Sequence, residues 1–350
     1  MKANNPDKES KDSMKPIKLI LKDNRIWIIG LIILLLVAII VSLSVGSGSA
    51  TIKDLFLFLL GKEKTKAIDI MMYIRLPRVL GAIFAGAGLA VSGVIIQSVL
   101  NNSLAGPNII GVNAGAGFFM ALAAIVLPNK PSIMPLAAFI GALITVLLVF
   151  YAGKRTGASR ITLVLAGIAI NSLLNAATDA ILTFVPDAIL NHYSFRIGGL
   201  SNINVKTLYP ALVGIGIGLI LTICLHNEMD VLSLGEETAK NLGLNTAWYR
   251  FILLFLAAVM AGASVSFSGL LGFVGLIIPH ISRAIVGSEG KYLIPVAGLM
   301  GAAFLTLCDL LARRLFAPYD ISVGIILSFL GAPFFLYLLI KKKGGKEVYD

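Results

Sequence analysis

The chain has 350 residues, of which 57% are hydrophobic and 13% charged, whereas about 25% of the residues in ordinary soluble domains are charged. At about 20 apolar residues for each membrane-spanning helix, this composition supplies at most about ten spans. The net charge of +11 does not indicate nucleic-acid binding, because a mean hydropathy of +0.91 leaves little polar surface for a basic face. The composition excludes a soluble globule and predicts an all-α membrane protein.

The first apolar segment, 31–45, follows a polar run that is too long for a signal peptide, and no small-residue cleavage site follows it. We therefore expect it to remain as the first span. Cys224 and Cys308 lie far apart in apolar sequence, so neither a disulfide framework nor a set of metal ligands is expected.

Segments without Asp, Glu, Lys or Arg predict the spans, because a charge near the bilayer centre is costly. In chain order these segments are 26–52, 79–129, 131–153, 161–178, 207–227, 251–282, 292–308 and 321–340. The second is long enough for two helices, with a break near 101–108 where Asn, Ser, Gly and Pro cluster. The sixth also holds two helices, with a bend at Ser268 and Gly269. Ten spans result.

Most of the Lys and Arg residues fall on one side of the membrane if both termini are cytoplasmic, as the positive-inside rule requires. This set includes the N-terminal run together with Lys154, Arg155, Arg160, Lys341, Lys342, Lys343 and Lys346. We expect a cytoplasmic tail at 1–25, a transmembrane domain at 26–340 and a cytoplasmic tail at 341–350. The protein is then a multi-pass protein of the cell membrane.

A few arginines fall on the outer side, where topology does not explain them: Arg75, Arg78, Arg313 and Arg314. Arg75 and Arg78 flank Pro77, which favours a helix start at the membrane surface. Asp309 lies four residues before Arg313, so one explanation is that this pair neutralises itself. The alternative is that the outer arginines bind carboxylates of a partner.

Two short segments resemble each other. Residues 85–93 read AGAGLAVSG and residues 261–269 read AGASVSFSG, identical at five of nine positions. Small residues recur in packed membrane helices, so chance similarity is one explanation. Because the two predicted spans run in opposite directions, a true relation would be an inverted repeat of the kind found in transporters.

The polar interruption at 226–250 lies on the predicted inner side. Within it, 232–244 is typical of a short helix, with Glu236 and Glu237 in its first turn and Gly243 near its end. It is either a solvated connecting helix or a docking helix for a cytoplasmic partner.

Enzymatic motifs are absent from the sequence. Neither Gly61-Lys62-Glu63 nor Gly153-Lys154-Arg155 fits a phosphate-binding Gly-Lys-Ser/Thr loop, so no ATP hydrolysis is expected by that route. The three histidines are dispersed, and His280 after Pro279 is explained by a polar contact at a kink. An ion-coupled transporter would place ionisable groups near mid-membrane, and Asp179 is the best candidate for one.

Several motifs resemble the FecCD-type permeases of ABC importers for iron-siderophores, haem and cobalamin. The matching residues are Arg75-Leu76-Pro77-Arg78, 86–93 with Gln97, 104–107 with Gly111, 232–244, 272–280 with Arg283, Asp309 with Arg313, and 331–334. The resemblance covers about 73–340 in collinear order. Asn102-Ser103-Leu104-Ala105 departs from the family's usual Asn-Pro-Leu-Ala, so the backbone there is expected to be less rigid.

The resemblance implies the type II importer permease fold, with ten helices and a homodimer or heterodimer of permease subunits. It also implies two cytoplasmic ATP-binding subunits, an extracellular substrate-binding lipoprotein, and no cofactor or metal in this chain. By motif position, the binding-protein contacts are Arg75, Arg78 and Arg313. The coupling loop at about 228–246 uses Leu234, Gly235, Glu236, Glu237, Ala239, Leu242 and Gly243, and the inner gate uses Asn102, Leu104 and Ser159.

The function expected from this reading is import of a ferric siderophore through a permease that has no ATPase site of its own. Haem and cobalamin are the alternative cargoes of the same machinery. An ion-coupled secondary transporter is the less favoured alternative.

Overall fold

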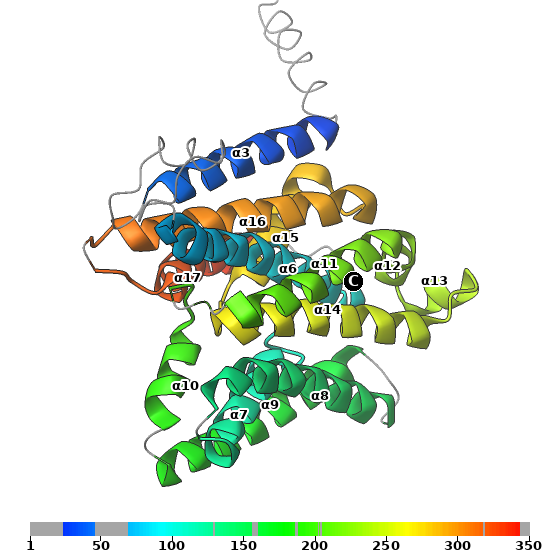
Figure 1. Cartoon of the computed structure of the whole chain (residues 1–350). Coiled ribbons are helices and arrows are strands. Elements are labelled where there is room, and N and C mark those ends of the chain that lie inside the picture. The colour runs from blue at the N-terminus through cyan, green and yellow to red at the C-terminus, as the bar shows by residue number, and fades with distance from the viewer. Residues whose placement is uncertain are drawn as a thin grey trace, which may run out of the picture.

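The computed structural model describes residues 24–45, 69–128, 130–155, 160–185, 188–201, 203, 205–317 and 319–343. Every regular element in this part of the chain is a helix (Figure 1). The two predicted cytoplasmic tails fall largely on 1–23 and 344–350, which lie outside the described part. Ser159 of the predicted gate lies in 156–159, which is also outside it.

Ten helices correspond to the ten predicted spans. They are α3 (Asn24–Ser44), α6 (Leu76–Leu100), α7 (Val112–Val126), α8 (Met134–Arg155), α9 (Arg160–Phe184), α11 (Val205–Cys224), α14 (Thr246–Ser268), α15 (Val274–Val286), α16 (Gly290–Arg314) and α17 (Val323–Lys343). Seven segments in the described residues are long and apolar enough to cross a membrane, while α7, α15 and Val323–Tyr337 are shorter apolar helices.

Both predicted helix breaks are confirmed. One falls between α6 and α7, where Asn101 adopts a left-handed conformation (φ +48°) and ends α6. The other falls after Ser268, where Gly269 has φ +68°. Such a φ favours glycine because a side chain would clash with the backbone.

The remaining short helices connect the spans. They are η1 (Met71–Arg75), η2 (Pro131–Ile133), α10 (Ala188–Ile197), α12 (His226–Ser233) and α13 (Glu236–Asn241). The sequence predicted one helix at 232–244. In the structure that segment is divided, because Gly235 (φ +114°) separates the end of α12 from α13.

The helix α6 lies at the centre and packs against α16, α14, α15 and α11. Almost all of its side chains are buried. A Cβ atom at Gly86 would clash with the carbonyl of Gly301 in α16, and one at Gly93 would clash with the carbonyl of Gly275 in α15. Small residues therefore allow the backbones to approach closely, as is common between membrane helices.

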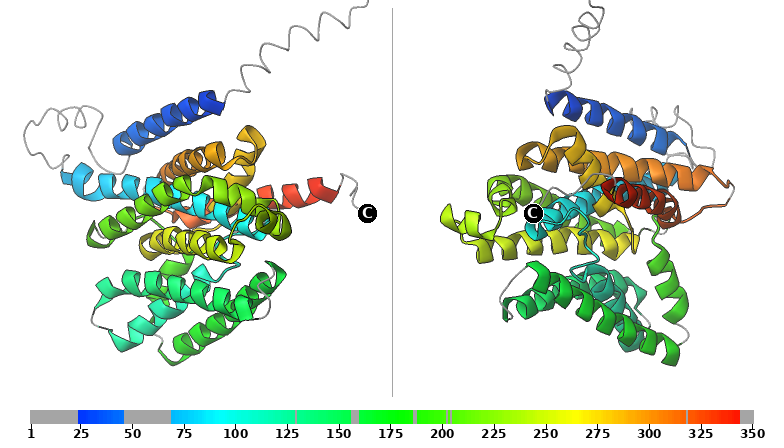
Figure 2. Two further views of the ribbon diagram at one scale, coloured as in Figure 1. Left: turned by 90° about the vertical axis from the view of Figure 1, so that its right-hand side faces the viewer. Right: turned by 180° about the vertical axis from the view of Figure 1, so that it is seen from behind.

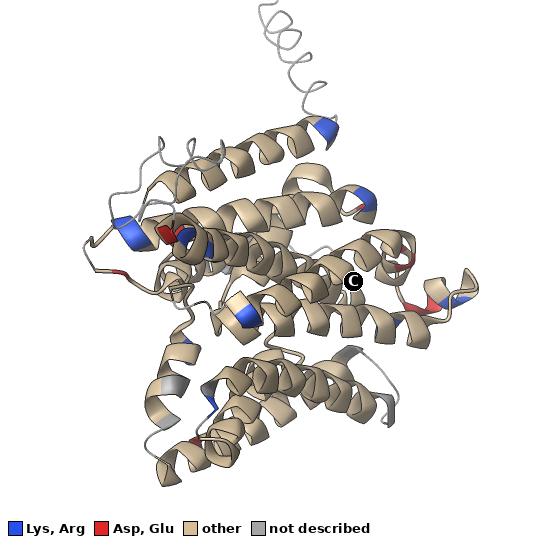
Figure 3. Ribbon diagram, viewed as in Figure 1, with Lys and Arg blue, Asp and Glu red and all other residues tan. Residues whose placement is uncertain are grey.

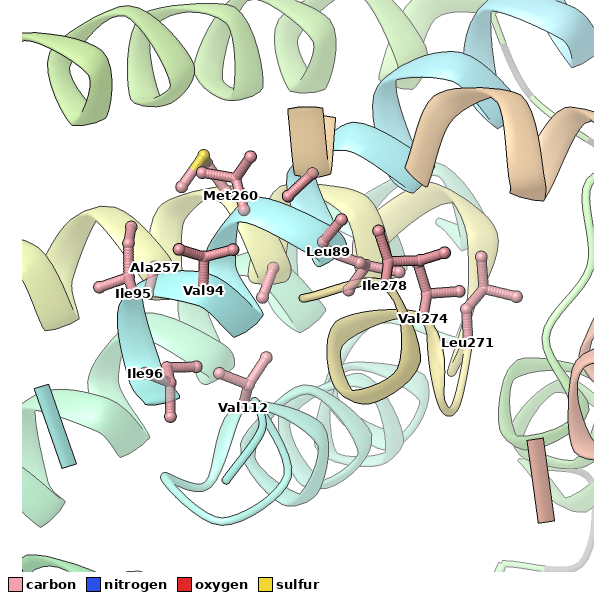
Figure 4. Packing of buried hydrophobic residues seen from close by; sticks show 14 of the residues in the cluster. Leu89, Val94, Ile95, Ile96, Val112, Ala257, Met260, Leu271, Val274 and Ile278 are labelled. Carbon is pink, nitrogen blue, oxygen red and sulfur yellow. The ribbon is translucent and has the colours of Figure 1, made fainter. Parts of the chain in front are cut away.

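Figure 4 shows the core where α6, α14 and α15 meet. Ile95 of α6, Met260 of α14 and Ile278 of α15 are fully buried there. The two similar segments also meet in this core, since a Cβ at Gly88 would lie 2.9 Å from Oγ of Ser264. The helices α6 and α14 run in opposite directions (Figure 1), as an inverted repeat requires.

The helices α7, α8, α9 and α10 form a separate layer beside this core (Figure 2). The layer attaches mainly through α8 and α7, which both contact α14. On the opposite side of the core, α3 packs on α16. Only a small share of α9 is buried within the chain, so most of its surface is free of contacts with the other described helices.

Charged residues gather at two opposite ends of the helices (Figure 3). We call the end with Arg75, Arg78, Asp309 and Arg313 the arginine end, and the end with α12 and α13 the coupling end. The long helices α6, α14 and α16 run between these two ends (Figures 1 and 3).

Candidate functional site

A buried ion network lies at the arginine end. Nε of Arg78 donates to both carboxylate oxygens of Asp309 at 2.9 and 3.1 Å, and its Nη1 donates to Asp320 at 2.7 Å. The Asp309 side chain is fully buried, whereas that of Asp320 is 43% exposed. Arg78 thus joins α6 to α16 and to the segment that follows α16.

The other two predicted arginines hold the end of α3. Arg313 pairs with Asp309 at 3.1 Å and donates to the carbonyls of Ser42 and Val45 at 3.2 and 3.1 Å and to the Ser42 hydroxyl. Arg75 donates to the carbonyl of Leu43 at 2.7 Å. The carbonyls of Ser42 and Leu43 belong to the last turn of α3 and that of Val45 follows it, where intrahelical donors are missing and cations are favoured.

The structure places Arg75, Arg78 and Arg313 at one end of the helices and buries all three against acceptors of this chain. The Asp309–Arg313 pair expected from the i, i+4 spacing is present. Arg78 also binds Asp309, and no local spacing in the sequence could reveal this contact, because α6 and α16 are far apart along the chain. At the same end, Arg314 is exposed.

The coupling end is built differently. Glu236 pairs with Lys240 at 2.8 Å and with Arg250 at 3.1 Å, and hydrogen bonds from these two cations hold the pKa of the Glu236 carboxyl below its usual value. Ala239 is buried and anchors α13 to the protein. Glu237 is exposed.

Two leucines flank α13 with their side chains in the open. Leu234 is 62% exposed and Leu242 is 63% exposed. Beside them, Gly243 has a φ of +83°, which suits a glycine at a helix end. Exposed leucines next to a short charged helix are typical of a surface that a partner covers.

One contact at this end escaped the sequence analysis. Both carboxylate oxygens of Asp230 in α12 accept from the backbone N–H of Gly290, at 3.0 and 2.9 Å, and so cap the start of α16. Burial raises the pKa of Asp230. Glu289, at the N-cap position of α16, makes no side-chain cap bond, and Asp230 supplies the cap from another helix.

The predicted inner gate lies in the loop after α6. The Asn102 side chain accepts from the backbone N–H of Leu104 at 2.9 Å, which forms a tight local turn. Nearby, Arg283 of α15 donates to the side chains of Gln97 and Ser98 and so fixes the end of α6. Asn102 and Leu104 are thus adjacent to a braced helix end.

The two residues without an assigned role occupy different places. The His280 ring packs edge-on against Phe334 of α17, with ring centres 6.3 Å apart. Asp179 lines a cavity between α7, α9 and α10 of about 540 Å³. In the described residues no group of three or more His, Cys, Asp or Glu side chains is placed to hold a metal ion.

Comparisons with known proteins give consistent matches. The chain matches the FecCD transport family over residues 34–341. It is 36% identical over 308 residues to the Fe(3+)-citrate import system permease protein YfmD of Bacillus subtilis, covering 87% of this chain and 91% of that protein. It is 35% identical over 323 residues to the hemin transport system permease protein HmuU of Yersinia pestis, covering 89% and 95%.

A solved structure matches as well. It is described as an inward-facing conformation of a metal-chelate type ABC transporter, and it matches with a TM-score of 0.79 at 30% sequence identity. The match covers 91% of this chain and 100% of that chain. The arrangement of helices in Figures 1 and 2 is therefore that of an importer permease.

Proposed function

Because this chain belongs to the FecCD transport family, we propose that it is the subunit through which a ferric siderophore crosses the cell membrane. The coarser statement follows from the family itself. The chain is a multi-pass permease of an ABC importer for iron chelates or haem, and it is a transport protein without a catalytic domain. This confirms the resemblance inferred from the motifs.

The coupling end carries the proposal most directly. The exposed Leu234 and Leu242 flank α13, whose Glu237 is also exposed and whose Ala239 anchors it to the core. A cytoplasmic ATP-binding subunit that covers this surface moves α13, and the anchored helix passes the motion to α12 and α14, which contact it. ATP is bound and hydrolysed in the partner subunits, and this chain needs no cofactor.

The arginine end is the proposed landing site of an extracellular binding lipoprotein. This end contains four arginines and two carboxylates, which are Arg75, Arg78, Arg313 and Arg314 with Asp309 and Asp320. This excess of positive charge attracts acidic side chains of a partner. Because the first three guanidinium groups already have acceptors within the chain, glutamates of the partner compete with these bonds on docking.

The cycle that follows is alternating access in a dimer of this chain with a second copy or a related permease. Loaded binding protein docks at the arginine end, ATP binding draws the partner ATPases together, and the coupling end transmits that motion. Asn102, Leu104 and Ser159 close the pathway on the cytoplasmic side. Both termini face the cytoplasm in this arrangement, as the distribution of Lys and Arg favours.

Transport by the reconstituted complex tests this function. The chain is placed in proteoliposomes with its ATPase subunits and binding protein, and uptake of ferric citrate, a ferric hydroxamate, haem and cobalamin is measured. We expect uptake of a ferric chelate that requires ATP hydrolysis. Uptake driven by an ion gradient without ATP would contradict the proposal, and transport of haem or cobalamin alone would leave the permease function but change its cargo.

A further inference from the structure

The cavity between α7, α9 and α10 is lined by polar groups that helix packing alone does not require. Its volume of about 540 Å³ is within the range of small-molecule sites. Polar groups line it from three helices: Asn113 of α7, Asn171, Asn175 and Asp179 of α9, and His192 and Arg196 of α10. A cavity of about 410 Å³ between α8, α11 and α14 is instead lined largely by apolar residues.

The polar groups of α9 follow one side of a membrane helix. Asn171, Asn175 and Asp179 are spaced by four residues, so they project from neighbouring positions on one face. In the half of α9 that begins at Arg160, exposed positions such as Ile161 and Leu165 are apolar. Polar and charged residues in a membrane span are costly unless they face water or a ligand.

The helix α10 presents its two polar groups from a fixed position. The backbone N–H of Leu270 donates to the carbonyl of Phe195 at 2.8 Å, and the Phe195 side chain is buried. His192 and Arg196 are four residues apart and flank this anchor. A Cβ at Gly117 of α7 would lie 3.6 Å from Nε2 of His192, an ordinary contact distance, so the imidazole lies directly beside α7.

Two of these groups have unused bonding capacity. Asn171 donates through Nδ2 to the carbonyl of Asn108 at 2.7 Å, but within the described part of the chain its buried Oδ1 has no hydrogen-bond partner. Arg196 has no ion-pair partner among the residues that the structure describes. A buried acceptor without a partner is unfavourable, so a donor from a bound molecule or water improves the site.

We propose that this cavity is a binding subsite within the permease for the oxygen-rich face of the cargo chelate. Arg196 binds a carboxylate of the chelate, the asparagine amides bind its hydroxyl and carbonyl oxygens, and Asp179 accepts from its hydroxyl groups. Eight of the eleven residues that line the cavity are polar, so the subsite favours hydrophilic chelates over a porphyrin ring. This inference rests on the proposed function and narrows its substrate class.

The test compares uptake with ATP hydrolysis in the reconstituted complex. The double variant Asn175→Leu with Arg196→Gln is measured with the ferric chelate that the intact complex transports fastest from the panel above. We expect about a tenfold loss of chelate taken up for each ATP hydrolysed. Stimulation of ATP hydrolysis by the loaded binding protein is expected to stay unchanged, because neither end of the helices is altered.

The controls separate a subsite from a structural role. Ser172→Ala changes a residue of α9 beside Asn171 that does not line the cavity, and it should leave the ratio unchanged. Arg196→Lys keeps the positive charge and should retain most of the uptake. An unchanged ratio in the double variant, or an equal fall of uptake and ATP hydrolysis, overturns the subsite.

Failure of the proposed function gives a different result. If the intact complex transports only haem or cobalamin, the subsite is overturned while the permease function stands. If none of the four compounds enters in an ATP-dependent manner, both proposals fall.

Discussion

Both ends of the molecule contain charged residues, but the two ends differ in how far these side chains are exposed to solvent. At the arginine end, Asp309 is 0% exposed and every guanidinium of the network is buried. At the coupling end, the side chain of Lys240 is 60% exposed and Leu242 is 63% exposed. The first end uses charge to hold its own helices together, whereas the second leaves charge and apolar surface for another protein.

Removal of Asp309 should give the largest effect. Asp309→Ala leaves Arg78 and Arg313 buried without their shared carboxylate, and breaking a buried pair in this way costs about 3–5 kcal/mol. Thermal unfolding of the purified protein in detergent measures the loss. Asp320→Ala is the matched control, because that side chain is 43% exposed and its pair should contribute about 1 kcal/mol or less. Equal losses would remove the distinction between the buried and exposed pairs.

Charge reversal at the coupling end should lower coupling to the ATPase, and it also removes the Glu236 carboxylate that pairs with the buried Arg250, so thermal unfolding is measured beside it. Glu236→Lys with Glu237→Lys should lower stimulation of the partner ATPase about tenfold, which corresponds to about 1.4 kcal/mol of lost interaction. ATP hydrolysis by the assembled complex in proteoliposomes is the measurement. Normal coupling would rule out α13 as the docking helix, and Lys291→Glu, at the start of α16, serves as the control reversal.

Loss of the α16 cap should have an intermediate effect on stability. Asp230→Ala removes both acceptors of the Gly290 N–H and should cost about 1 kcal/mol, as is usual for a lost N-cap. Unfolding in detergent reports it. Glu228→Ala, on the same short helix and without a recorded bond to α16, should change stability less; the reverse order would contradict the capping role.

The smallest effect concerns pH and Glu236. Its pKa in the folded protein is below its unfolded value, so its contribution is present above the unfolded pKa and is lost as pH falls through the folded pKa. The side chain is 34% exposed, so this contribution is about 0.5 kcal/mol. The stability difference between the wild type and Glu236→Gln should therefore vanish at low pH. A difference that grows on acidification would reverse the assignment.

Features that depend on local sequence could be predicted. The break after α6 follows from Asn, Ser, Gly and Pro side by side, and the bend after α14 follows from Gly269. The exposed α13 could also be anticipated, because acidic residues at its start and Gly243 after its end are local signals.

Features that depend on contacts between distant helices could not. The Arg78–Asp309 pair and the Asp230 cap join residues that are far apart in the sequence, and no local periodicity predicts such contacts. The short helix α10 was also missed, because its ten residues include His192 and Arg196 and resemble a polar loop. Whether Asn102, Leu104 and Ser159 form a gate stays a prediction, and Ser159 lies outside the described residues.

The single helix α16 runs from Gly290, capped by Asp230 of α12, to Arg314, and near that second end its Asp309 pairs with Arg78 of α6 and its Arg313 binds Ser42 of α3. A rigid helix of this kind couples binding at one end of the molecule to binding at the other. If binding of an external protein shifts α16 and thereby changes the affinity for the ATP-binding subunits, those subunits change the affinity for the external protein by the same factor. Docking of the loaded binding protein and binding of ATP would then act on the same variable, the position of α16.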